Sequence, residues 1–144
     1  MSRTFTLEME SRDYGCDLQG IINNSVYLNY LEHTRHTFLK HLGLDFAGLH
    51  LEGYDAVVRR VEIEYRRSLK GMERFVSHLQ VSRKGRLQYV FDQNLRRASD
   101  NEEMVRARTF VAFVKEGRPV QPPAPVVTAM AGWLADSSGD APCI

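Results

Sequence analysis

The sequence predicts an α+β fold in which one long helix packs against one face of an antiparallel sheet. Two observations support this prediction. Apolar residues recur at three- and four-residue spacings over residues 25–42, which is the period of an amphipathic helix. One segment before that helix and four segments after it alternate apolar with polar residues, which is typical of half-buried strands. A helix with one apolar stripe buries that stripe against a sheet, so this order of elements favours an α+β domain.

The first two elements are expected before residue 43. A strand is expected where Phe5, Leu7 and Met9 alternate with polar residues. The helix is expected from about Ser25 to Leu42, and Gly43 is of the residue type that commonly follows a helix end. The predicted buried stripe of the helix consists of Tyr27, Tyr30, Leu31, Thr34, Phe38 and Leu42.

Residues 44–53 are expected to form a loop rich in apolar side chains, either a lid over a ligand or a satellite of the core. Four strands should follow, at about residues 55–67, 74–82, 87–97 and 104–115. Two of the intervening turns are indicated by Lys84-Gly85-Arg86 and Ser99-Asp100-Asn101. In the first of these strands Val57, Val61, Ile63 and Tyr65 are expected on one face, which Arg59 interrupts.

The composition changes after Gly117, and the chain is divided there. Residues 1–118 are expected to form the folded domain. Residues 119–144 are expected to form a proline-rich arm, a short amphipathic helix over about residues 126–135 and a flexible tail. The sequence leaves open whether this C-terminal part caps a pocket or an interface between subunits.

The bulk composition excludes several functional classes. A net charge of +1, from 19 basic and 18 acidic residues, argues against a nucleic-acid binder. No apolar run is long enough to span a membrane, and the first residues lack the apolar core of a signal peptide. Two cysteines, Cys16 and Cys143, do not make a disulfide framework, so a cytoplasmic location is expected. No spacing of Cys and His indicates a metal site, and no cofactor is expected.

A polar loop leading into the helix carries the chemistry. Asp13 and Asp17 lie in this loop, Gly20 permits a tight turn, and Asn23 and Asn24 are helix-capping residue types. A helix N-terminus has unpaired N–H groups and about half a positive charge, so it can hold an oxygen that becomes negative during a reaction. A carboxylate beside such a helix end indicates attack on a carbonyl group.

The order of these residues resembles the opening motif of hotdog-fold acyl-CoA thioesterases. The motif runs Asp13-x-x-x-Asp17-x-x-Gly20-x-x-Asn23-Asn24-x-x-Tyr27, with Glu32 and Arg35 further along the helix. The similarity is to the branch typified by 4-hydroxybenzoyl-CoA thioesterase, and residues 57–65 look like that family's next strand. Together the matches cover roughly residues 3–116. Ile21 stands where members often carry His.

The resemblance implies a hotdog fold, in which a long antiparallel sheet wraps around one central helix, and a thioester hydrolase. Asp17 matches the catalytic acid, as nucleophile or general base, and Asn24 matches the backbone N–H that binds the oxyanion. Asp13 is expected to be structural. Gly20, Asn23 and Tyr27 are substrate-binding candidates, and Arg59 is the foremost of six basic candidates for the phosphates of coenzyme A. The other five are Arg60, Arg66, Arg67, Lys84 and Arg86.

The implied partners are an acyl-CoA or an acyl carrier protein thioester and further copies of the chain. The family forms dimers with active sites at the subunit interface, often paired into homotetramers. Two alternatives remain open. One is a non-catalytic protein that binds acyl thioesters on the same fold. The other is a hotdog dehydratase, which is disfavoured because Ile21 removes the most obvious histidine base.

Overall fold

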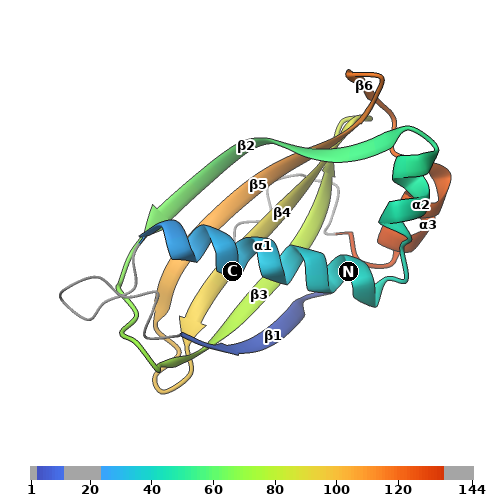
Figure 1. Cartoon of the computed structure of the whole chain (residues 1–144). Helices are drawn as coiled ribbons and strands as arrows, with labels where there is room; N and C mark the ends of the chain where they lie inside the picture. Colours follow the sequence, from blue (N-terminus) through green and yellow to red (C-terminus); the bar gives the residue numbers. More distant parts are fainter. Residues whose placement is uncertain (1–2, 12–23, 135–144) are drawn as a thin grey trace.

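The structure is a computed structural model that describes residues 3–11 and 24–134 (Figure 1). Its helices are α1 (Asn24–His41), α2 (Phe46–Leu51) and α3 (Ala124–Ala131). Its strands are β1 (Phe5–Glu10), β2 (Tyr54–Tyr65), β3 (Arg74–Lys84), β4 (Gln88–Arg97), β5 (Glu103–Lys115) and β6 (Arg118–Val120). The predicted strand, long helix and four further strands are confirmed, with boundaries that differ by at most a few residues.

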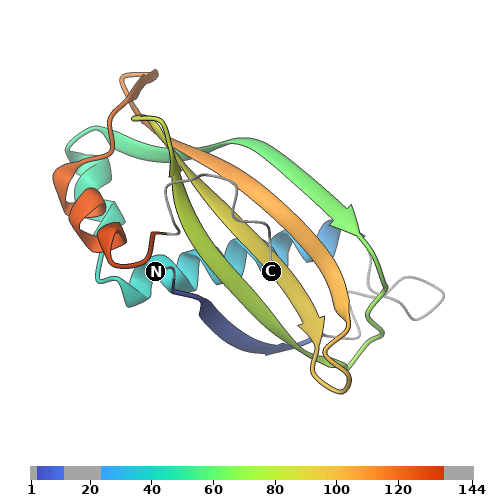
Figure 2. The ribbon, with the colours of Figure 1, turned by 180° about the vertical axis from the view of Figure 1, so that it is seen from behind.

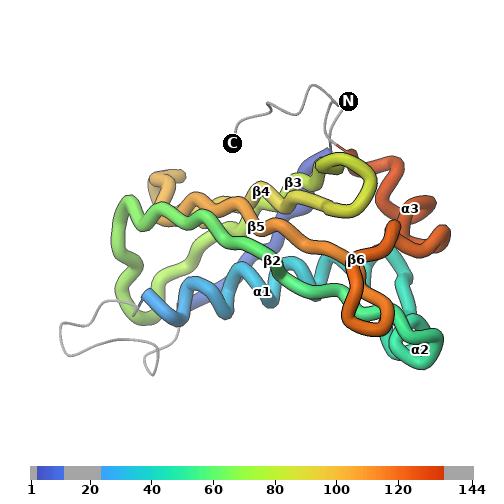
Figure 3. The backbone as a smooth tube through the Cα atoms, turned by 90° about the horizontal axis from the view of Figure 1, so that it is seen from above, coloured from blue at the N-terminus to red at the C-terminus, as the bar shows by residue number. Residues whose placement is uncertain are grey.

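One antiparallel sheet holds the strands in the order β1-β3-β4-β5-β2, and β6 pairs with β5. The sheet curls around α1, which lies along its concave face, while the opposite face carries no helix along its length in the described part of the chain (Figure 2). Helices α2 and α3 lie at the end of the sheet where α1 finishes (Figure 3). A long antiparallel sheet wrapped around one central helix is the hotdog fold, as the sequence predicts.

Helix α1 buries the stripe that its periodicity predicts. Tyr27, Leu31, Thr34 and Phe38 are buried, while Tyr30 is partly buried. The apolar side chains beneath α1 form two clusters. One surrounds Tyr27 and Leu31 near the start of the helix, and the other surrounds Phe38 near its end. Basic Lys40 and His41 occupy the last turn, where positive charge favours the helix dipole.

Polar contacts join α1 to the sheet between these two clusters. The hydroxyls of Thr34 and Ser77 are 2.7 Å apart, and both residues are fully buried. Gln93 Nε2 donates to the Leu31 carbonyl at 3.0 Å, and Arg35 Nη1 donates to Gln93 Oε1 at 3.1 Å. Buried polar groups that lose a partner are costly, so these contacts fix the rotation and the position of α1 on the sheet.

A β-bulge changes the expected faces of β2. The pairing with β5 shifts between Val58 and Arg60, so Arg59 is an extra residue in the strand. Val58, rather than Val57, therefore shares a face with Val61, Ile63 and Tyr65. The prediction that Arg59 interrupts the apolar face is wrong, because the bulge absorbs that residue and restores the alternation after it.

Two short elements escaped the sequence analysis. Residues 44–53 contain a helical turn and a half, α2, whose N-terminus is capped by Asp45 Oδ1 accepting from Gly48 N at 2.9 Å. Leu49 of α2 is buried in the core cluster around Phe38, which favours the satellite interpretation of this segment. In the C-terminal part, residues 118–120 form β6, and the expected helix runs over Ala124–Ala131.

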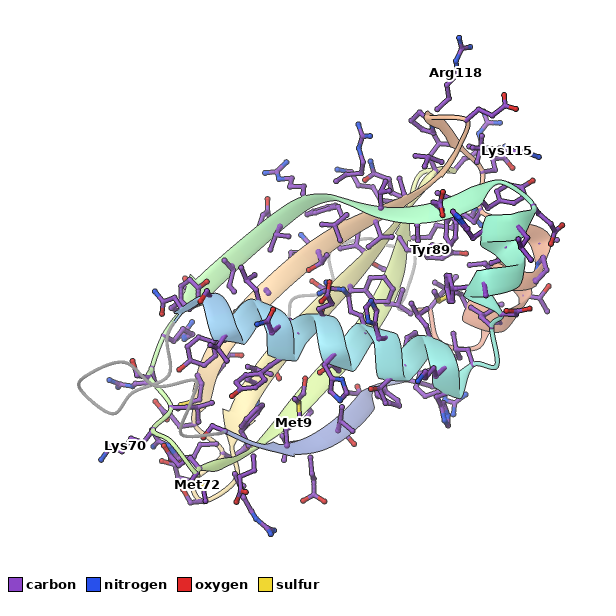
Figure 4. All side chains as sticks on the ribbon, viewed as in Figure 1. Met9, Lys70, Met72, Tyr89, Lys115 and Arg118 are labelled. Atoms are coloured by element: carbon purple, nitrogen blue, oxygen red, sulfur yellow. The ribbon has the colours of Figure 1, made fainter. Side chains whose placement is uncertain are left out.

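Two buried tyrosines, one on α1 and one on β4, differ in the hydrogen bonding of their hydroxyls. The Tyr27 hydroxyl accepts a hydrogen bond from the backbone N–H of Leu69 at 2.7 Å. The Tyr89 hydroxyl, in the view of Figure 4 between α1 and β2, is buried without a hydrogen-bond partner among the described residues. Each tyrosine is 1% exposed.

Replacing Tyr27 with Phe is expected to lower the free energy of unfolding by about 1–3 kcal/mol, because the buried Leu69 N–H loses its acceptor. Replacing Tyr89 with Phe should leave that free energy unchanged or raise it, since no hydrogen bond within the described structure is lost. Urea denaturation of both variants measures the difference. An equal loss of unfolding free energy in the two variants would contradict the stabilising role of the hydrogen bond between Tyr27 and Leu69.

Candidate active site

The start of α1 is the part of the predicted active site that the structure describes. Asp13, Asp17, Gly20 and Asn23 lie outside the described residues. Asn24 is the first residue of α1 and is exposed. The first turn of α1 contains no acidic side chain, so no carboxylate within that turn offsets the positive end of the helix dipole.

Tyr65 ties this helix end to the end of β2. Its hydroxyl donates to the Asn24 carbonyl at 3.4 Å, and its ring centroid lies 5.8 Å from that of Tyr27. Because the opposite end of β2 lies beside the second half of α1, strand and helix run antiparallel (Figure 1). The N-terminus of α1 and the start of β2 are therefore at opposite ends of the molecule.

The other two described candidates lie in different surroundings. Tyr27 is buried in the apolar cluster near the start of α1, with its hydroxyl bonded to the main chain. Arg59 is exposed at the bulge of β2 and makes no salt bridge to any residue in the described part of the chain. Arg60, Arg66 and Arg67 instead pair with the carboxylates of Glu62, Glu64 and Glu102, respectively.

A cavity of about 650 Å³, here called the outer cavity, lies between the second half of α1, the α2 region and the start of β2. It is lined by His33, His36, Thr37, Leu39, Lys40, Leu44, Phe46, Tyr54, Asp55 and Ala56. One wall is held by His50 Nδ1, which lies 2.6 Å from Asp55 Oδ1 and so joins α2 to β2. The volume is in the range of small-molecule sites.

A second cavity, of about 150 Å³, lies deeper and is here called the inner cavity. It shares four wall residues with the outer cavity, namely His36, Leu39, Phe46 and Ala56, so the two are contiguous. Its remaining apolar wall comes from β2, β4, β5 and α3 through Val58, Tyr89, Phe91, Val111, Phe113 and Met130. The path from outer to inner cavity therefore leads from the helix–strand gap toward the centre of the sheet.

Two polar side chains of the inner cavity have shifted ionisation. Burial lowers the pKa of the Arg35 guanidinium, and the nearby Glu32 carboxylate opposes that shift. Burial raises the pKa of the Tyr89 hydroxyl, an effect that the Arg83 charge opposes. Arg35 also reaches Thr109 Oγ1 at 3.4 Å besides its bond to Gln93. An apolar cavity with a few oriented donors suits a mainly apolar ligand.

A basic patch lies on the opposite face of the sheet. Cationic groups of Arg60, Lys84 and Arg108 lie 5.5, 4.9 and 5.8 Å from the ring centroid of Phe110. These residues line a pocket of about 320 Å³. Arg108 is held by Asp92 at 2.8 Å, and burial raises the pKa of that carboxyl group against the effect of Arg108. Arg60 and Lys84 were among the sequence candidates for phosphate binding, whereas Arg108 was not.

Sequence reasoning missed the residues that build the two cavities. Phe46, Tyr89 and Met130 lie on three different elements. The patterns around Tyr89 and Met130 predict a strand and a short amphipathic helix, and Phe46 belongs to the segment expected to be either a lid or a satellite of the core. The sole hint was the apolar content of residues 44–53, for which a lid was one interpretation; Leu44 and Phe46 do line the outer cavity.

None of the helices within residues 3–11 and 24–134 is long and apolar enough to cross a membrane.

Comparisons with known proteins agree with this architecture. The family model of the thioesterase superfamily matches residues 19–104, more than half of the chain. The chloroplastic acyl-acyl carrier protein thioesterase ATL3 of Arabidopsis thaliana is 26% identical over 135 residues, which cover 93% of this chain and 71% of that protein.

Solved structures have the same fold. A hypothetical protein from Aquifex aeolicus superposes with a TM-score of 0.79 at 26% identity, covering 87% of this chain and 98% of that one. A 1,4-dihydroxy-2-naphthoyl-CoA thioesterase from Synechocystis superposes with a TM-score of 0.84 at 17% identity, covering 90% and 96% of the two chains. With the family match over residues 19–104, these findings establish that the chain belongs to the thioesterase superfamily and is a thioester hydrolase with the hotdog fold.

Proposed function

We propose that the protein hydrolyses an acyl thioester of coenzyme A or of acyl carrier protein to the free acid and the thiol. Asp17 is the catalytic carboxylate, and the backbone N–H at the Asn24 position binds the oxyanion. The observation that carries this proposal is the start of α1 at Asn24, at the position where the sequence motif expects the oxyanion donor. Membership of the branch typified by 4-hydroxybenzoyl-CoA thioesterase stays a prediction.

Thioester hydrolysis requires a hydrogen-bond donor for the oxyanion and a group that supplies or activates the attacking oxygen. In one route Asp17 removes a proton from water, the hydroxide attacks the thioester carbon, and the tetrahedral oxyanion accepts hydrogen bonds from the helix N-terminus. Collapse of the intermediate expels the thiolate, which takes the proton held by Asp17 and so restores the carboxylate. In the other route the Asp17 carboxylate attacks directly, the thiolate leaves, and water cleaves the resulting anhydride. The absence of acidic residues in the first turn of α1 supports oxyanion binding in either route.

The acyl group occupies the contiguous outer and inner cavities. Their apolar walls are chemically suited to a hydrocarbon or aromatic acyl group. Within one chain, however, the start of α1 lies about 18 Å along the helix from His36, at a rise of 1.5 Å per residue. Such a distance favours a site in which the catalytic loop and the acyl cavity belong to different protomers.

Strand β2 offers the surface that brings two protomers together. It is twelve residues long and, among the described strands, pairs only with β5, so its other edge is open. Val58, Val61 and Tyr65 beside that edge are 49%, 40% and 39% exposed. Long apolar edge strands are normally covered, and two copies of β2 can pair antiparallel about a two-fold axis. That pairing sets the Tyr65 end of one β2, with its helix N-terminus, against the Tyr54 end and the outer cavity of the other.

The remaining sequence candidates have supporting roles in this proposal. Gly20 and Asn23 shape the loop beside the thioester, and Tyr27 fixes the helix start beneath it. Arg59 binds a phosphate of the carrier, which its exposure and its place on the β2 edge support. A tetramer of two such dimers stays a prediction of the resemblance.

Replacing Asp17 with Asn is expected to reduce thiol release by about 10²–10⁴-fold, because the variant can neither attack nor accept a proton. The assay uses short, long and aromatic acyl groups on both coenzyme A and acyl carrier protein. Asp13→Asn is the matched control and should keep most of the activity. Turnover by Asp17→Asn equal to that of the wild type would rule out the assigned role, and elimination of water from a 3-hydroxyacyl thioester would favour the dehydratase alternative.

Replacing Val61 with Asp is expected to convert the dimer into monomers and to abolish most turnover, because a charge is placed on the apolar edge of β2. Sedimentation velocity measures the assembly state. Leu87→Asp is the control, since Leu87 is equally exposed at 40% but lies between β3 and β4. A Val61→Asp protein that stays dimeric, or a monomeric wild type with full activity, would refute the split site.

A further inference from the structure

We propose that α3 closes the inner end of the acyl cavity and that the Met130 side chain sets the longest acyl chain the enzyme accepts. The inference deepens the proposed function and rests on it. It assigns a role to the C-terminal segment, which lies beyond the residues that the family model matches.

The position of Met130 supports this role. Among the described residues, the outer cavity is lined by α1, the α2 region and β2, whereas the inner cavity adds residues of β4, β5 and α3. Met130 is the residue of α3 that lines the inner cavity, and it is 2% exposed. A chain entering through the outer cavity therefore meets Met130 at the deep wall.

Helix α3 is anchored firmly enough to act as a wall. Trp133, just after the helix, packs edge-on against Phe38 of α1 with ring centroids 5.1 Å apart. The Arg3 guanidinium lies 3.7 Å from the Trp133 ring centroid. Leu134 then forms a β-bridge with Val81 of β3. These contacts connect the end of α3 to α1, to the N-terminal segment and to the sheet.

The chemistry of the wall suits a hydrocarbon chain end. Methionine is apolar, unbranched and adaptable, so it can pack against a terminal methyl group without a fixed shape. The neighbouring wall residues Phe91, Val111 and Phe113 are apolar as well. The Arg35 guanidinium at this cavity is engaged with Gln93 and Thr109 rather than aimed at the deep wall.

A matched pair of substitutions on α3 tests the proposal. Met130→Ala removes the three heavy atoms beyond Cβ, so the preferred chain should become longer by about three carbons. The ratio of kcat/KM on that longer chain to kcat/KM on the wild type's preferred chain should be about tenfold or more higher in the variant than in the wild type. The reason is that a single methylene in an apolar pocket changes kcat/KM by this much. Val126→Ala is the control, because Val126 is fully buried in the same cluster but does not line the cavity.

The measurement is kcat/KM over saturated acyl groups from hexanoyl to stearoyl, on whichever carrier supports turnover, with thermal denaturation of each variant alongside. Val126→Ala should lose stability but keep the wild-type length profile, and Met130→Leu should keep that profile as well. An unchanged profile in Met130→Ala, or the same shift in Val126→Ala, would overturn the proposal.

A second readout separates this inference from the proposed function. S-alkyl pantetheine thioethers cannot be hydrolysed and carry the part common to coenzyme A and acyl carrier protein, and their binding is measured by titration calorimetry. A length cut-off in binding that Met130→Ala extends supports the inference even if the wild type hydrolyses no thioester. If the enzyme turns over thioesters but Met130→Ala leaves the chain-length cut-off unchanged, the role of Met130 is overturned and the proposed function stands. If the wild type neither binds nor hydrolyses any chain, the role of Met130 and the proposed function are both overturned.

Discussion

The arrangement of the molecule depends on a few polar contacts at the centre of the interface between α1 and the sheet. Apolar clusters on either side supply most of the burial, but they would tolerate a small rotation or slide of the helix. Two polar contacts do not tolerate such a movement, because a displaced helix would leave buried polar groups unpaired. They are the Thr34–Ser77 hydroxyl pair and the hydrogen bond from Gln93 to the Leu31 carbonyl. These contacts hold the helix N-terminus at one end of the sheet and the helix wall of both cavities at the other.

The main elements could be predicted from the sequence because each has a long periodic pattern. Eighteen residues of α1 repeat one stripe often enough to identify it, and the turns at Gly85 and Asn101, both with positive φ, carry their own residue signals. The errors lie where the pattern is short or broken. The six residues of α2 make fewer than two turns, which is too short for a clear helical period. Pro119 is a residue type that argues against a strand, although β6 forms there. One inserted residue in β2 changes the face of the sheet that Val57 occupies.

The candidate site was predictable only in part, for a different reason. A loop-and-helix motif is local, so the order of its residues along the chain is enough to make Asp17 and Asn24 candidates. The cavities are assembled from α1, the α2 region, β2, β4, β5 and α3, and no local spacing brings Phe46, Tyr89 and Met130 together. Tyr89 illustrates the difficulty. The alternation of residues in β4 predicts its burial correctly. The same pattern does not indicate that the Tyr89 ring lines a cavity, or that its hydroxyl lacks a hydrogen-bond partner among the described residues.

The bulge in β2 has a consequence for how freely the strand can change. Val58 pairs with Val111 and Arg60 with Phe110, which are consecutive in β5, so the loss of Arg59 would leave every other side chain of β2 on its present face. The strand would lose local twist and bend, not its pattern of burial. Arg59 is thus the position in β2 whose identity the pleat of the sheet does not dictate. The residue at this position can therefore be replaced, or be lost, without refolding the sheet.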